Sequence, residues 1–204
     1  MTTIVDYGVG NVQAICNVYK RLNIPVVFGK TPDDLRAATK LILPGVGAFD
    51  HAMVRLNESG MRATLDELVL EKKVPVVGIC VGMQMLTQAS DEGQLPGLGW
   101  IPGRVRAFQS HNIPGLMVPH LGWNDVAPVP GARLFTQLET GARFYFLHSY
   151  YVECERAEDV AARCSYGLDF ACAVGHDNIL GVQFHPEKSH HFGTRLLQNF
   201  AELA

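Results

Sequence analysis

The feature that most constrains the fold is an apolar strand that runs directly into a cysteine between glycines. Residues 74–79 form the most apolar strand-like run, and Cys80 follows at once, with Gly78 and Gly82 on either side. A run that is apolar on both faces is typical of a central parallel strand. Residues 83–86 then favour a helix. The segment therefore predicts a buried strand, a tight turn that needs glycine, and a helix.

Short β-branched runs alternate with helical stretches in the first half of the chain, which predicts a parallel sheet with flanking helices. Thr31 and Pro32 mark a helix start, as cap and first helical residue. Strand 41–43 runs into a Pro-Gly-Val-Gly turn. The predicted order is strand 3–5, helix 11–22, strand 26–28, the helix after Thr31, strand 41–43, helix 61–72 and strand 74–79.

The second half has frequent glycine and proline and shorter apolar runs, which predicts mixed or antiparallel additions to the sheet. Residues 170–174 and 179–184 flank a turn-prone segment and predict a hairpin. Residues 192–203 predict a closing helix with Leu196 and Phe200 on its apolar face. The expected fold class is α/β, a largely parallel central sheet with helices on both faces plus added antiparallel strands.

Length and composition indicate one domain, residues 1–204, because this chain can fill one core but not comfortably two. The net charge of -3 argues against a nucleic-acid partner. No signal peptide and no apolar run of about 20 residues is found, so a cytoplasmic protein without membrane contact is expected. Five cysteines without a close pair predict neither disulfides nor a metal site.

Cys80 is the candidate nucleophile. The following helix directs its free N–H groups and positive dipole end at the sulfur, which favours the thiolate. The backbone N–H of Val81 faces the same side and can hold a developing oxyanion. The alternative, a buried structural cysteine, stays open. Cys16, in a predicted helix, and Cys172, in a predicted strand, are interpreted as core residues.

His185 is the candidate proton shuttle among the eight histidines. It follows a predicted strand, and Glu187 comes two residues later, with Pro186 fixing the backbone between them. If the segment is extended, both side chains project to one side, so Glu187 can orient the imidazole. The alternative is a polar turn at a strand end. The pairing of these residues with Cys80 favours nucleophilic catalysis.

The two motifs together resemble those of the class I, or triad, glutamine amidotransferases. They are Gly-Ile-Cys-Val-Gly-Met-Gln at 78–84 and Val-Gln-Phe-His-Pro-Glu at 182–187. The resemblance implies the fold of that family and a glutaminase without a cofactor. It also implies Cys80 as nucleophile, His185 as general base and acid, and Glu187 as the orienting carboxylate.

Four further segments are similar to the glutaminase subunits of imidazole glycerol phosphate synthases. They lie at 6–11, 43–49, 119–124 and 148–151, and the likeness extends from residue 6 to about 200. It implies a role in histidine biosynthesis, as one subunit of a heterodimer. Ammonia from glutamine would pass to a separate (β/α)8-barrel cyclase subunit.

The same resemblance assigns further roles. It implies that the glutamine pocket is formed by Gly47, Gln84, Glu92, Ser149 and Tyr150. It implies an oxyanion hole from Val46, Gly47 and Val81. It implies a cyclase interface that includes Asn11, His120 and Trp123.

From the residues alone, purely structural roles for these three residues stay open. Asn11 is a helix-cap residue, Trp123 in a loop is either core or an interface anchor, and His120 is equally well a satisfied polar residue. Val46 lies between two glycines, so the peptide units around it can rotate at low steric cost. The hypothesis is that partner binding turns a backbone N–H of this loop toward the oxyanion and so sets the glutaminase activity.

Two competing functions remain. One is a glutaminase of the same fold that serves another synthase, such as those making anthranilate, pyridoxal phosphate or GMP; the segments at 6–11 and 119–124 argue against it. The other is a binding module that kept the fold and lost its chemistry. The presence of Cys80, His185 and Glu187 argues against that.

Overall fold

The computed structural model describes residues 1–203 apart from the side chain of Ser110; Ala204, the end of the predicted domain, lies outside the described residues. The strands are β1 (Thr2–Val5), β2 (Val26–Gly29), β3 (Lys40–Gly45), β4 (Val76–Cys80), β5 (Ala89–Ser90), β6 (Gly103–Ala107), β7 (His120–Asp125), β8 (Ala127–Pro128), β9 (Arg143–His148), β10 (Tyr150–Cys154), β11 (Val160–Tyr166), β12 (Leu168–His176) and β13 (Ile179–Val182). The α-helices are α1 (Val12–Arg21), α2 (Pro32–Leu35), α3 (Phe49–Glu58), α4 (Arg62–Asp66), α5 (Val81–Met85) and α6 (His190–Glu202). The other helical turns are η1 (Glu67–Glu71), η2 (Phe108–His111), η3 (Arg133–Phe135), η4 (Ala157–Asp159) and η5 (Pro186–Lys188).

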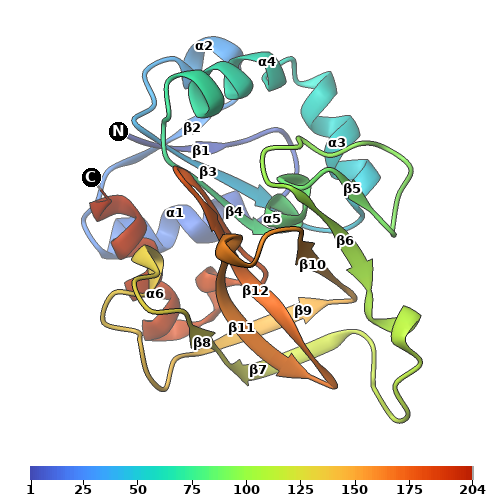
Figure 1. The fold of residues 1–204 in the computed structure, drawn as a ribbon. Coiled ribbons are helices and arrows are strands. Elements are labelled where there is room, and N and C mark those ends of the chain that lie inside the picture. Colours follow the sequence, from blue (N-terminus) through green and yellow to red (C-terminus); the bar gives the residue numbers. More distant parts are fainter. Residues whose placement is uncertain (204) are drawn as a thin grey trace.

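Within residues 1–203 the main sheet has 11 strands, in the order β2-β1-β3-β4-β13-β12-β10-β6-β5, with β11 beside β12 and β8 beside β11. The strands from β2 to β13 run parallel, whereas β12 and β10 join antiparallel. The helices α2, α3 and α4 lie along one face of the parallel part, and α1 and α6 along the other (Figure 1). The predicted fold class is confirmed.

The first elements follow the prediction, and local chemistry explains where they begin. In α2 the Thr31 hydroxyl accepts the Asp34 N–H at 3.3 Å, and the Asp34 carboxylate accepts the Thr31 N–H at 2.9 Å. This reciprocal pair satisfies N–H groups that a helix start leaves free. Asn11 occupies the cap position of α1, but its exposed side chain makes no capping hydrogen bond.

β3 is longer than predicted, because it continues through Pro44 to Gly45. Leu41 donates its N–H toward the β4 side, to the Pro75 carbonyl, so the nitrogen of Pro44 faces the β1 side. There the pairing with β1 has already ended, at Ile42. The missing N–H of proline therefore costs no ladder hydrogen bond.

Two helical segments differ from the prediction. The expected continuous helix at 61–72 is α4 followed by the π-helical turn η1. Helix α3 was not predicted; it begins at Phe49, directly after the Pro-Gly-Val-Gly segment, and buries Phe49, Met53 and Leu56. Its start closes the loop that leaves β3.

β7 and β9 form a separate antiparallel ribbon. Trp123 lies in β7 opposite Tyr145 of β9, so the prediction that it sits in a loop was wrong. The flanking Gly122 and Asn124 gave the segment a turn-like composition, and cross-strand pairing overrides it. Alternation in β7 directs Leu121 and Trp123 outward.

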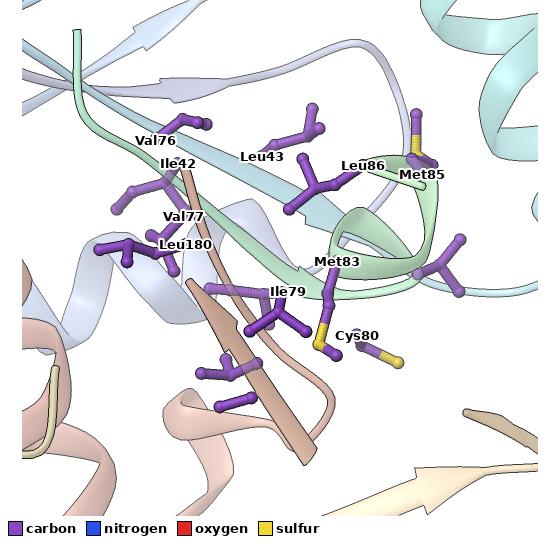
Figure 2. Close-up of a cluster of buried hydrophobic side chains, with 14 of the residues drawn as sticks. Ile42, Leu43, Val76, Val77, Ile79, Cys80, Met83, Met85, Leu86 and Leu180 are labelled. Atoms are coloured by element: carbon purple, nitrogen blue, oxygen red, sulfur yellow. The ribbon is translucent and has the colours of Figure 1, made fainter. Parts of the chain in front are cut away.

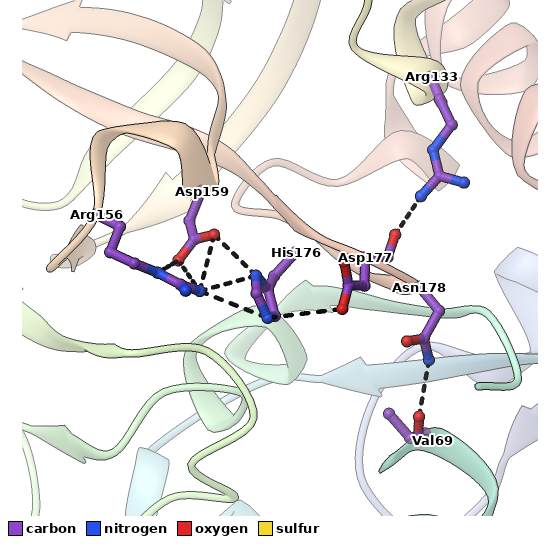
Figure 3. A network of polar contacts seen from close by, with 7 residues as sticks. All are labelled: Val69, Arg133, Arg156, Asp159, His176, Asp177 and Asn178. Carbon is purple, nitrogen blue, oxygen red and sulfur yellow. Dashed lines mark hydrogen bonds and ion pairs between the residues drawn. The ribbon is translucent and has the colours of Figure 1, made fainter. Parts of the chain in front are cut away.

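The predicted hairpin is β12–β13, although β13 ends at Val182. A charged network braces its turn (Figure 3): Asp159, 1% exposed, accepts from Arg156 at 2.9 Å and contacts His176 at 3.0 Å. Arg133 donates to the carbonyl of Asp177 beside it. These contacts brace the turn between β12 and β13.

The core lies on both faces of the parallel strands, and β4 is buried along its whole length. Side chains from β3, β4, α5 and β13 meet there, and Cys80 lies at the edge of this cluster, where β4 ends (Figure 2). Cys172 is fully buried and Cys16 packs partly buried against the core, as predicted. No helix within residues 1–203 is long and apolar enough to cross a membrane.

Candidate active site

Cys80 occupies a strained turn between β4 and α5. Its φ of 56° lies in the left-handed region, which a residue with a Cβ adopts at a cost of about 1–3 kcal/mol. Close packing on both sides explains the flanking glycines: a Cβ on Gly82 would lie 1.9 Å from the Leu43 carbonyl oxygen of β3, and one on Gly78 would lie 2.6 Å from the Gly82 oxygen of α5. The turn therefore holds the Cys80 sulfur at the end of β4, as the motif predicted.

His185 reaches the same end of the sheet through β13. Val182 pairs with Ile79 across the parallel strands, so both chains leave the sheet side by side. The His185 N–H donates to the Tyr145 carbonyl at 2.9 Å, which anchors the segment to β9. The ring lines the same cavity as Cys80, and the sulfur is close enough to raise the pKa of the imidazole.

Glu187 contacts the other side of the imidazole: its Oε1 lies 2.9 Å from Nδ1 of His185. The two side chains are 5% and 1% exposed. The expectation of an extended segment was wrong, because Glu187 lies in the 3-10 turn η5, which begins at Pro186. The turn still brings the carboxylate back to the ring, and Nδ1 contacts Glu187, which leaves Nε2 for the sulfur.

The surroundings of His185 favour its charged form. Burial alone lowers the pKa of His185, but the hydrogen bonds and negative charges of Cys80 and Glu187 outweigh burial and raise it to about 10. At neutral pH His185 is then an imidazolium. Tyr7 lies near enough that burial, and after it the charge of Cys80, raises the pKa of its phenol.

A cavity of about 340 Å³ opens beside Cys80. It is lined by Val46, Gly47, Cys80, Val81, Gln84, Glu92, Pro119, Leu147, His148, Ser149, Tyr150, His185 and Lys188. Every predicted pocket and oxyanion residue is in this lining, together with Cys80 and His185. Glu187 lies behind the imidazole, outside the cavity wall.

The acidic wall of the cavity is Glu92. Its Oε2 accepts the backbone N–H of Phe49 at 2.8 Å, which ties the wall to the start of α3. Burial, and after it the charge of Glu92, raises the pKa of Tyr150. In the same lining Gly47 has a φ of 81°, and Val46 beside it is 40% exposed. The cavity thus offers a carboxylate and a glycine-rich loop around the sulfur.

Two side chains near Cys80 were not among the predicted site residues. Gln183 is completely buried, and its Nε2 lies 3.8 Å from the Cys80 sulfur. His148 lines the cavity and contacts the Tyr150 carbonyl through Nδ1 at 2.7 Å. The sequence signal for Gln183 was a polar residue in an apolar strand-like run; His148 carried none beyond its place next to Ser149.

The predicted interface residues lie in different settings. Trp123 is 39% exposed and stacks on His190 with ring centroids 5.3 Å apart, and Asn11 is exposed. His120 is 2% exposed, stacks between Phe146 and Tyr166, and contacts His148 at 2.9 Å. This burial and these contacts favour the alternative interpretation, a satisfied polar residue.

The family profile described as "Glutamine amidotransferase class-I" matches residues 3–203. The chain belongs to the class I glutamine amidotransferases. It is 64% identical over its full length to the imidazole glycerol phosphate synthase subunit HisH of Bdellovibrio bacteriovorus, all of which is covered. It is 53% identical to the HisH subunit of Leptospira interrogans, with both chains fully covered. Both relatives are therefore HisH subunits that align with this chain from end to end.

Solved structures show the same amidotransferase fold at low sequence identity. A crystal structure of a glutamine amidotransferase matches with a TM-score of 0.73 and 21% identity, over 98% of this chain and 97% of that one. The structure of PurLQS from Thermotoga maritima matches with a TM-score of 0.72 and 18% identity, over 98% and 96%. The predicted class I amidotransferase fold is confirmed.

Proposed function

We propose that this amidotransferase hydrolyses glutamine to glutamate and ammonia through a Cys80-His185-Glu187 triad, as the glutaminase subunit of an imidazole glycerol phosphate synthase. One observation carries the proposal: one cavity is lined by a sulfur on a strained turn and by an imidazole that a buried carboxylate contacts. We also infer that residues 1–204 form a single domain, because the parallel and antiparallel parts share one sheet.

In the first step the Cys80 thiolate attacks the side-chain carboxamide of glutamine. The carbonyl electron pair moves to oxygen and forms a tetrahedral oxyanion. The His185 imidazolium then gives its proton to the departing nitrogen, the C–N bond breaks, and ammonia leaves a γ-glutamyl thioester. Glu187 holds the ring orientation and stabilises its positive charge.

In the second step water hydrolyses the thioester. His185, now neutral, takes a proton from water as the hydroxyl adds to the carbonyl. The C–S bond then breaks with its electron pair on sulfur, which returns Cys80 as thiolate and His185 as imidazolium. Glutamate leaves, and the ion pair is ready for another cycle.

The cavity supplies the electrostatic partners of both steps. The Val81 N–H at the start of α5 is one oxyanion donor, and the loop at Val46 and Gly47 supplies the other. Glu92 fits the α-ammonium group of glutamine. The remaining walls of the pocket are formed by Gly47, Gln84, Ser149 and Tyr150.

The ammonia acceptor is proposed to be a separate (β/α)8-barrel cyclase subunit, which makes the protein one half of a cytoplasmic heterodimer with overall lyase chemistry in histidine biosynthesis. The HisH names of the relatives support this. The outward face of β7–β9 supports it as well: Leu121 and Leu147 are register partners, 59% and 41% exposed, beside Trp123. Leu147 also lines the cavity, so a partner on this face would sit over the active site. Asn11 is a further proposed contact.

A covalent probe tests the glutaminase step. Incubation with a glutamine chloroketone analogue, followed by peptide mass spectrometry, is expected to label Cys80, and excess glutamine should protect it. A protein that binds the analogue without an adduct on Cys80 would be a binding module instead.

The partner is tested separately. Purified cyclase subunits and other amidotransferase-dependent synthases are supplied with this chain and glutamine, and product formation is measured. Only the imidazole glycerol phosphate cyclase is expected to form product. If a synthase for anthranilate, pyridoxal phosphate or GMP were supplied with ammonia instead, the proposed pathway would be wrong.

A further inference from the structure

A buried carboxamide lies against the sulfur of Cys80, away from the cavity. Gln183 follows β13, has no exposed surface and is absent from the cavity lining. Its backbone N–H donates to the Cys172 carbonyl at 2.9 Å, so the main chain is fixed to β12. Its neighbours Val182 and Phe184 are also fully buried. A carboxamide in such a place costs free energy unless its hydrogen bonds are made.

Two contacts fix which end of this carboxamide faces the sulfur. The Tyr150 carbonyl can only accept hydrogen bonds, and it lies 3.3 Å from Nε2 of Gln84, so that end of Gln84 is the NH2 group. The same NH2 group lies 3.1 Å from Gln183, whose facing atom must then be the acceptor oxygen. The NH2 group of Gln183 is therefore left facing Cys80, at 3.8 Å.

We propose that Gln183 is a positioning residue for the Cys80 thiolate: its amide N–H donates to the sulfur and holds it toward the cavity. This inference rests on the proposed glutaminase function. A thiolate accepts such a hydrogen bond strongly, and a thioester sulfur only weakly. The contact therefore favours the thiolate both before attack on glutamine and when the C–S bond breaks.

The charged and titratable groups around the sulfur set the background for this contact. His185 contacts the sulfur, and Tyr7 approaches it from the segment after β1. Four others line the cavity: Glu92, His148, Tyr150 and Lys188. None of these substitutes for Gln183, because they line the cavity or approach from the segment after β1, whereas the buried carboxamide is absent from the cavity lining.

The test measures how the reactivity of Cys80 depends on pH. The full chain is alkylated with iodoacetamide between pH 4 and 10, and the Cys80 peptide is followed by mass spectrometry. In Gln183→Met, which keeps the length but loses the donor, the midpoint of alkylation should rise by about one pH unit, a tenfold loss of thiolate at low pH. In Gln183→Glu an ionised carboxylate would face the sulfur, so the midpoint should rise further.

A matched control separates this effect from simple loss of a buried carboxamide. Asn199 in α6 is also a buried amide and donates to the Leu134 and Thr136 carbonyls, away from the cavity. Asn199→Leu should lower stability and leave the alkylation midpoint unchanged. Equal midpoints in wild type, Gln183→Met and Gln183→Glu would overturn the inference, and so would an equal shift in Asn199→Leu.

A kinetic readout completes the test and distinguishes the two proposals. In the complex with the cyclase, Gln183→Met should lower kcat about tenfold with the KM for glutamine within about twofold, because the residue does not line the cavity. A higher KM at unchanged kcat would instead make Gln183 a pocket residue. If wild type itself formed no Cys80 adduct with the chloroketone, the glutaminase function would fail, not the role of Gln183.

Discussion

Cys80 is the register partner of Gly45 across the parallel strands β3 and β4. The two strands therefore end side by side, so the loop that begins at Val46 starts next to the sulfur. This neighbour relationship brings the proposed oxyanion donors of two separate loops to one cavity. The chemistry of the cavity thus depends on sheet pairing as well as on the motif around Cys80.

Replacing the sulfur should separate the two half-reactions. Cys80→Ala is expected to lower glutamine-dependent activity by at least about 10⁴-fold, because no nucleophile remains. The partner should still make product from added ammonium. The matched control is Cys16→Ala, because Cys16 in α1 is partly buried and packs against the core. This variant should retain activity. Loss of the ammonium-dependent activity as well would give Cys80 a structural role.

Glu187→Gln should be milder than Cys80→Ala. The glutamine can still contact Nδ1 of His185, but the negative charge that raises the pKa of His185 is lost. The kcat for glutamine hydrolysis should fall by about 10²–10⁴. Steady-state ammonia release from pH 6 to 10 checks this, and the alkaline limb of the rate profile should move to lower pH. An unchanged alkaline limb would show that Glu187 does not act on His185.

Gly47→Ala tests the oxyanion loop. Gly47 has a φ of 81°, and a Cβ added there would have no atom within 4 Å, so the change restricts the backbone without a clash. The glutaminase rate in the complex should fall by about 10², the value of one oxyanion donor. Gly60→Ala is the control, with a φ of 70° and equally open surroundings after α3. If both variants kept full activity, the loop would not supply a donor.

Gly82→Ala tests the close packing behind the nucleophile turn. The added Cβ would lie 1.9 Å from the Leu43 carbonyl oxygen, so β3 or α5 must shift. The free energy of unfolding should fall by about 3 kcal/mol or more. Gly99→Ala, with a φ of 70° and open space around it, should cost only about 1–2 kcal/mol. Urea unfolding measures both; equal losses would contradict the packing argument.

Stability should fall as the pH drops from about 6.5 toward 4. Burial lowers the pKa of His120 to about 4, and burial, before any neighbour, lowers that of His148 to about 3. In this window the unfolded chain binds protons that the folded pair does not, so acid favours unfolding. His120→Phe should make the slope of unfolding free energy against pH shallower. His51→Asn, exposed in α3, should keep the wild-type slope.

Much of the site could be predicted because its signals are local. The glycines around Cys80 are required by the close approach of β3 to Gly82 and of α5 to Gly78, and Pro186 starts the turn that carries Glu187. Where local signals conflict with pairing, the prediction failed. Trp123 lies in a strand although its neighbours favour a turn, and the π-helical turn at Glu67–Glu71 interrupts a segment that favours a continuous helix.

Sequence by itself determined the strand-turn-helix around Cys80 and the succession of parallel elements, because each depends on residues close together in the chain. The pocket residues came from the family resemblance and not from local patterns. Only the tertiary structure decided that His120 is buried and that the carboxamide of Gln183 faces the sulfur. Both depend on strands that are far apart in sequence and meet through sheet pairing, and short-range periodicity carries no information about such contacts.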